Sequence, residues 1–191
     1  MTRSSSNRIQ TRCRMSVVEH FILLSRYNAD MNRKLYDAAA QLPAGELTAD
    51  RKAFFGSLAG TLNHLLAGDT IWLKRFSTHP AAFPALQATQ ELPPPSGLTH
   101  SFGDRLPPLR AYREKLDAII SAFTPQLTAA DLAHTFEYRS TRGDVYRKEF
   151  GLVLLHFFNH QTHHRGQAST LLTQAGADFG VTDLLLWVPD L

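Results

Sequence analysis

Residues 156–167 read His156-Phe157-Phe158-Asn159-His160-Gln161-Thr162-His163-His164-Arg165-Gly166-Gln167. Residues four apart share one face of an α-helix, so His156, His160 and His164 form one ridge and His163 lies to its side. Apolar residues fall on the same stripe, and we therefore expect this ridge to point into the protein. Imidazoles on adjacent turns of a rigid helix suit a transition metal. The alternative is a set of core histidines satisfied by hydrogen bonds.

The chain has 191 residues and a formal net charge of +3, and its positive charge is concentrated at one end. Residues 1–14 carry four arginines and no acid; without them, 16 basic residues face 17 acidic ones, a net charge of −1 for residues 15–191. This balance gives no reason to expect a nucleic-acid partner. The single cysteine, Cys13, excludes an intrachain disulfide and a zinc site built from cysteines. No apolar run is long enough for a transmembrane helix, so we expect no membrane partner.

Residues 1–14 are rich in serine and arginine and lack the apolar segment of a secretory signal. We expect them to form a disordered basic tail, and residues 15–191 to form a single domain. Patterned sequence begins directly after Met15, which favours Met15 as the working start codon. We expect the protein to be cytoplasmic.

Three further segments show the spacing of three and four residues between apolar positions that is typical of amphipathic helices. They span about residues 16–42, 48–76 and 106–123. Ser16, with Glu19 three positions later, predicts a capping box at the start of the first helix. Pro43 and Gly45 end that helix.

The helix predicted for residues 48–76 contains two polar residues with two interpretations each. His64 has Gly60 and Gly68 one turn to either side. A glycine inside a helix costs about 1 kcal/mol relative to alanine. Either space beside the imidazole matters, or small residues let two helices pack closely. Asp69 lies on the apolar seam, either as an acceptor for a ligand histidine or as a core carboxylate paired with an arginine.

The segments between these helices have different character. Residues 77–102 hold five prolines, so we expect an irregular crossover without regular helix, with His79 and His100 at the surface. In residues 134–150 the residue pattern has a period of two on both sides of a glycine-containing turn, which predicts a short β-hairpin. The last helix, about residues 151–174, begins apolar nearly all round; either it is central, or one face meets another subunit.

Three motifs together resemble those of the DinB/YfiT-like family of metal-dependent enzymes. They are Tyr27-Asn28 in the first helix, Gly-Thr-Leu-Asn-His-Leu-Leu at residues 60–66, and His-x3-His-Arg-Gly-Gln at residues 160–167. The resemblance covers nearly all of residues 16–191. It implies an all-α four-helix bundle with a long proline-rich crossover and a small β-hairpin before the last helix. It also implies a homodimer.

The resemblance further implies one divalent metal ion held by His64, His160 and His164. His156 matches no ligand position and is expected in the second shell or the core, while His163 is expected to be exposed or at an interface. On a straight helix His156 and His164 are about 12 Å apart along the axis. They cannot both ligate one ion through bonds of about 2 Å. The remaining candidates for the pocket wall, each with an equally good structural explanation, are Tyr27, Asn28, Asp69, Arg165 and Gln167.

Three imidazoles leave coordination positions open, as in catalytic sites. Zinc and nickel both suit such ligands. The resemblance implies an enzyme that acts on a small molecule by thiol transfer, thiol-dependent isomerisation or hydrolysis, with a low-molecular-weight thiol as a possible partner. The alternative is a non-catalytic metal-binding protein induced by stress or damage. The absence of Glu-x-x-His argues against a di-iron carboxylate protein, and the absence of His-Glu-x-x-His against a metallopeptidase.

Overall fold

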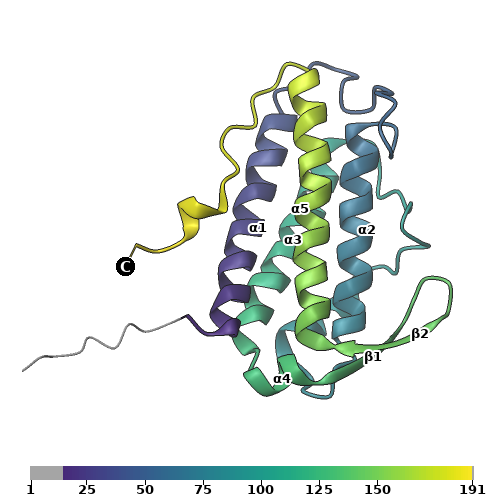
Figure 1. The fold of residues 1–191 in the computed structure, drawn as a ribbon. Helices are drawn as coiled ribbons and strands as arrows, with labels where there is room; N and C mark the ends of the chain where they lie inside the picture. The colour runs from purple at the N-terminus through teal and green to yellow at the C-terminus, as the bar shows by residue number, and fades with distance from the viewer. Residues whose placement is uncertain (1–14, 191) are drawn as a thin grey trace, which may run out of the picture.

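A computed structural model describes residues 15–190, so the predictions made for the tail concern residues outside the described part. The described chain is mostly helical, with one two-stranded antiparallel hairpin (Figure 1). The long helices are α1 (Val17–Ala39), α2 (Leu58–Phe76), α3 (Leu106–Phe123) and α5 (Phe150–Gln174). The shorter ones are η1 (Pro84–Glu91), η2 (Thr124–Gln126), α4 (Ala129–Ala133) and η3 (Leu184–Trp187).

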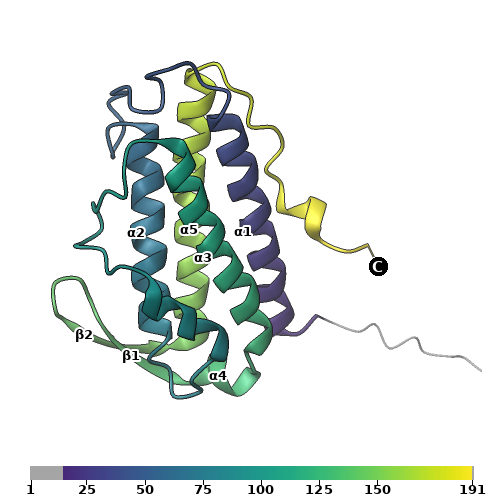
Figure 2. The ribbon, with the colours of Figure 1, turned by 180° about the vertical axis from the view of Figure 1, so that it is seen from behind.

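The four long helices lie side by side, and α1 and α2 each pack against both α3 and α5 (Figures 1 and 2). α2 and α3 run in the same direction, so the chain between them returns along the length of the molecule (Figure 2). α5 runs antiparallel to α2 (Figure 1). This arrangement places the second half of α5 beside the first half of α2, where the predicted ligands lie.

Local sequence signals explain most helix ends. The capping box of Ser16 and Glu19 at the start of α1 is confirmed. Gly176, with φ of +84°, follows the last turn of α5, and its amide donates to Thr173 while the next amide donates to Leu172. These two bonds form a Schellman motif, which favours glycine because the left-handed conformation crowds a Cβ.

The predicted start of the second helix is wrong by about ten residues. α2 begins at Leu58, capped by the side chain of Ser57. The preceding residues form an isolated bridge between Ala53 and Gly56, and Gly56 adopts φ of +75°. This left-handed residue interrupts the helical path, so Phe55 lies in a loop although its spacing matched the helical seam.

The crossover is less irregular than predicted. η1 occupies eight of its residues as a 3₁₀ helix with Pro84 in its first turn, a position that needs no amide donor. His79 is buried, 4 % exposed, which corrects its expected surface position. Its ring packs among aromatic side chains that include Phe83 and Phe150. Sequence analysis also missed the short helix α4, which has its own capping box at Thr128 and Asp131.

The predicted hairpin is confirmed as β1 (Thr135–Arg139) and β2 (Val145–Glu149), paired from Thr135 with Glu149 to Arg139 with Val145. Phe136 is 2 % exposed and anchors the hairpin on the helices. It contacts Phe76 and Phe150, so one end of the molecule is closed by aromatic packing.

The apolar first half of α5 is not buried on all sides. Leu152 is 60 % exposed and Leu155 is 52 % exposed, so this helix presents one apolar face outward. No helix within residues 15–190 combines the length and the apolar character needed to cross a membrane.

Candidate metal centre

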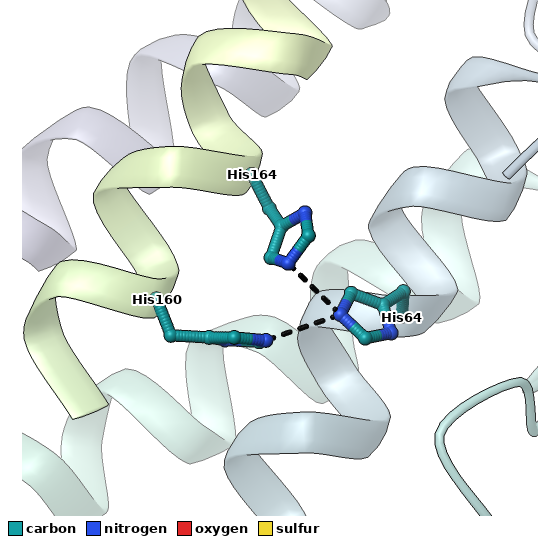
Figure 3. A group of neighbouring side chains, drawn as sticks. All are labelled: His64, His160 and His164. Carbon is teal, nitrogen blue, oxygen red and sulfur yellow. Dashed lines mark hydrogen bonds between the residues drawn. The ribbon is translucent and has the colours of Figure 1, made fainter. Parts of the chain in front are cut away.

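Three histidine side chains from two helices meet in the groove between α2 and α5. His64 comes from α2, and His160 and His164 come from successive turns of α5 (Figure 3). The Nε2 atom of His64 lies 3.1 Å from Nε2 of His160 and 3.1 Å from Nε2 of His164. His64 is 5 % exposed, His164 is 9 % exposed, and His160 is half-buried. We call these residues the three-histidine cluster.

Two glycines of α2 make room for the cluster and its neighbours. A Cβ added to Gly68 would lie 3.1 Å from Cε1 of His160, which is tighter than an ordinary contact. A Cβ added to Gly60 would lie 2.0 Å from the backbone oxygen of Phe55. Neither glycine leaves space beside His64: Gly68 faces the ring of His160 on α5, and Gly60 faces the backbone of Phe55.

Hydrogen bonds on the far side of two rings determine which nitrogen faces the cluster. Nδ1 of His64 donates to the backbone carbonyl of Leu98 at 2.9 Å, and Nδ1 of His164 donates to Oε1 of Gln167 at 2.8 Å. A carbonyl oxygen can only accept, so each neutral ring carries its proton on Nδ1 and presents the Nε2 lone pair to the cluster. His160 can donate to His64 in one tautomer, but the lone pairs of His64 and His164 face each other without a proton between them.

This donor set fits a divalent metal ion. Bonds of about 2.0–2.1 Å from nitrogen to zinc place neighbouring ligand nitrogens roughly 3 Å apart. The observed separation of 3.1 Å agrees with that spacing. A cation among the three Nε2 atoms would also remove the repulsion between the facing lone pairs. The cluster could therefore hold a metal ion.

The surroundings keep the cluster in its neutral, ligating form. Burial lowers the pKa of His64, His160 and His164 because a charged imidazolium loses its hydration. The pKa of His160 falls to about 3, chiefly through burial and further through the neighbouring histidines. Metal ions bind the unprotonated nitrogen, so protons compete weakly for this site at pH 7.

A cleft of about 360 Å³ lies on the side of the loops, and among the cluster residues His64 is in its lining. Phe55 forms one wall, stacked on His64 with ring centroids 4.0 Å apart and edge-on to His164 at 5.5 Å. The crossover supplies the opposite wall. Its polar lining residues there are Thr99, Ser101 and Asp104. Phe55 was not predicted as a cleft residue, because it falls within the helix predicted for residues 48–76. Leu98 was not predicted either, because a backbone carbonyl leaves no signal in a sequence.

Among the predicted residues of the last helix, some support the cluster and others do not. Gln167 orients His164, and its amide nitrogen also approaches Nε2 of His163 at 3.2 Å. His163 is exposed, as expected. His156 is exposed as well, which corrects its expected place in the core. The ridge therefore points inward only in part, at His160 and His164. Its ring centroid lies 6.1 Å from that of His160, on the solvent side of the groove.

The other predicted pocket residues lie in the interior, where they pair with residues other than the three histidines. Asp69 forms a buried ion pair with Arg113 of α3, so its structural interpretation is the observed one. Arg165 is 4 % exposed and donates to the side chain of Asn28, and it makes no ion pair within residues 15–190. Tyr27 donates to the carbonyl of Thr182 at 2.7 Å and holds the C-terminal segment against α1.

Comparison with known families agrees with this arrangement. The model of the DinB family matches residues 15–188. The chain belongs to the DinB family. Within this DinB-family protein, the cluster combines the histidine of the 60–66 motif with both histidines of the 160–167 motif. Searches among curated proteins and among solved structures found no match to the chain.

Proposed function

We propose that this DinB-family protein is a metal-dependent enzyme in which His64, His160 and His164 bind one divalent ion, zinc or nickel. The observation that carries the proposal is the convergence of three Nε2 atoms, two of which present lone pairs at 3.1 Å. Among residues 15–190, no fourth histidine, cysteine or carboxylate joins this group. Three protein ligands leave positions open for water or substrate, which is the arrangement of catalytic sites.

The proposed reaction is thiol transfer or thiol-dependent isomerisation on a small molecule, or its hydrolysis, with a thiol or water as the nucleophile. A divalent ion bound there would supply Lewis acidity, which favours deprotonation of such a nucleophile. The protein's own groups hold the rings in position through Leu98 and Gln167. Phe55 excludes water from one side of the imidazoles, and the cleft beside it admits the small molecule.

We also propose that the four long helices constitute the four-helix bundle of a single domain, and that the protein forms a homodimer. The packing of α1 and α2 against both α3 and α5 supports the bundle. The outward apolar side chain of Leu155, which is 52 % exposed, supports a subunit contact. Sedimentation velocity over a range of protein concentrations measures the assembly.

The test compares metal content and turnover in matched histidine variants. Protein purified without a metal-affinity column is subjected to elemental analysis and assayed with a panel of electrophiles, each combined with several biological thiols or with water alone. We expect His64→Ala to lose the bound metal and any turnover. The control is His20→Ala, which removes an exposed histidine of α1 and should keep both.

Full metal content in His64→Ala would show that the ligand assignment is wrong. The non-catalytic metal-binding alternative predicts a different result for the wild-type protein. It would hold one metal ion per chain and show no turnover across the panel, and chelation would lower its melting temperature strongly.

A further inference from the structure

A row of aromatic rings leads away from the three-histidine cluster along the groove between α2 and α5. On α2, Trp72 lies one turn beyond Gly68; on α5, His156 lies one turn before His160. The two helices are antiparallel, so these residues are opposite each other, with ring centroids 5.4 Å apart. The ring of His156 is 6.1 Å from that of His160. A row of neighbouring rings therefore extends from the cluster to Trp72.

The row ends in a cavity of about 310 Å³ between the groove and the β-hairpin. Tyr138 of β1 stands edge-on to Trp72, with ring centroids 5.2 Å apart. We call Trp72, Tyr138 and His156 the aromatic shelf. Leu152 and Val153 of α5 complete the apolar lining, and the cavity is bounded on the strand side by Lys148. These side chains surround open space. Side chains that served only to pack the hairpin onto the helices would fill that space.

The charges around the aromatic shelf are positive. No carboxylate is among the residues that line the cavity. The guanidinium of Arg75 lies over the ring of Trp72 at 4.6 Å and over that of Tyr138 at 5.4 Å. Within residues 15–190 neither Arg75 nor Lys148 forms an ion pair, and the neighbouring Glu137 is bonded to Arg147 at 2.7 Å. An apolar, aromatic cavity with a lysine in its lining and an arginine stacked on two of its rings favours a flat anion.

We propose that the aromatic shelf binds the flat part of the substrate, and that this substrate is an aromatic or conjugated carboxylate. Its ring lies against Trp72 and Tyr138, and its carboxylate faces Lys148. Its reactive end points along the groove toward His160. This inference rests on the proposed function, because only a reaction at the cluster makes the shelf part of an active site. The thiol or water would then reach the cluster through the loop-side cleft, opposite the shelf.

The test uses 2-naphthoate as the probe and Trp72 as the reporter. The chain has two tryptophans, so Trp187→Phe leaves Trp72 as the only indole. In that background we expect saturable quenching of fluorescence by 2-naphthoate. Lys148→Gln should weaken binding about three- to tenfold, since one partly exposed charge-assisted contact is lost. The neutral 2-naphthamide should be weaker by a similar factor, and cyclohexanecarboxylate should not bind detectably.

The matched control is Lys115→Gln, which removes an exposed lysine of α3 and should leave binding unchanged. Equal affinities of the Lys148 and Lys115 variants, or no saturable quenching by 2-naphthoate, would overturn the proposal. Each titration is repeated in His64→Ala. Binding that persists there supports the shelf, whereas binding lost together with the metal shows that the carboxylate sits at the ion and overturns it.

These measurements separate the two proposals. If quenching depends on Lys148 but the protein shows no turnover with any thiol or with water, binding at the aromatic shelf is supported and the enzymatic function is rejected. Turnover without binding of 2-naphthoate keeps the enzymatic function and removes the shelf.

Discussion

Two buried polar groups share helices α2 and α5, and they differ in how their charges are satisfied. One is the three-histidine cluster. The other is a network in the interior between all four long helices, in which Arg113 pairs with Asp69 and with Asp117 at 3.0 Å. Asn32 donates to Asp117 at 2.9 Å. We call it the arginine network, and its members are Asn28, Asn32, Asp69, Arg113, Asp117 and Arg165.

The arginine network contains its own counterions. Burial raises the pKa of Asp69 to about 6 although Arg113 opposes the shift, so the carboxylate is ionised at pH 7. Burial lowers the pKa of Arg165 to about 10, which leaves it charged. The cluster, in contrast, brings together three groups of the same kind and no counterion. The opposite charges of the arginine network offset part of the cost of burying one another, whereas neutral imidazole nitrogens that face each other without a proton between them are suited to bind a cation.

The largest effect is expected when the arginine network is broken. Arg113→Met leaves the buried Asp69 without its partner and should cost about 3–5 kcal/mol of unfolding free energy. Urea denaturation measures the loss, with Arg110→Met as the control. Arg110 pairs with Asp37 near the surface, so that change should cost at most about 1 kcal/mol. Metal content of the folded Arg113→Met protein should stay unchanged; a loss of metal would show that the two groups are coupled.

The next effect concerns the cluster and leaves the network intact. Gln167→Ala removes the acceptor that orients His164 and should weaken metal binding about 10- to 100-fold. Competition with a chromogenic chelator measures the affinity. Gln167→Glu keeps an acceptor oxygen and should retain affinity, and His163→Ala should change it little. If Gln167→Glu were as weak as Gln167→Ala, the hydrogen bond would not be the cause.

The smallest effect is a pH dependence of the metal-free protein. The pKa of His160 is about 3 when folded, against about 6.5 in an unfolded chain. Between these values the unfolded state takes up a proton that the folded state does not, so stability falls as the pH decreases through this window. From pH 7 to pH 5, His160 should account for at most about 2 kcal/mol. Urea denaturation in chelator should show a shallower pH dependence for His160→Gln than for the wild-type protein.

The comparison also shows which features a sequence can predict. Helical spacing predicted the long helices, with α3 correct at both ends, because apolar periodicity records which face is buried. The same spacing misplaced Phe55, since a residue in a loop can fall on a helical period by coincidence. The start of α2 is set by the left-handed Gly56 and by Ser57, two local signals that the longer pattern obscured.

The cluster's three members were predicted, whereas most of its supports were not. The resemblance to the DinB/YfiT-like family implied His64, His160 and His164, and the structure brings them together. The acceptor for His64 is a carbonyl 34 residues away, and every residue has such a group, so no side chain marks it. The burial of His79 and the exposure of His156 depend on how the hairpin and crossover pack. That packing is a tertiary property without local periodicity.

The distance along the chain between His64 and its partners has a consequence for the order of events in synthesis. His64 precedes His160 by 96 residues and His164 by 100. During translation α2 is made long before α5, and a nascent chain that carries His64 alone cannot form the three-nitrogen site. Under the proposed function, metal loading follows the docking of the last long helix. Bound metal would then report that a molecule has completed its folding.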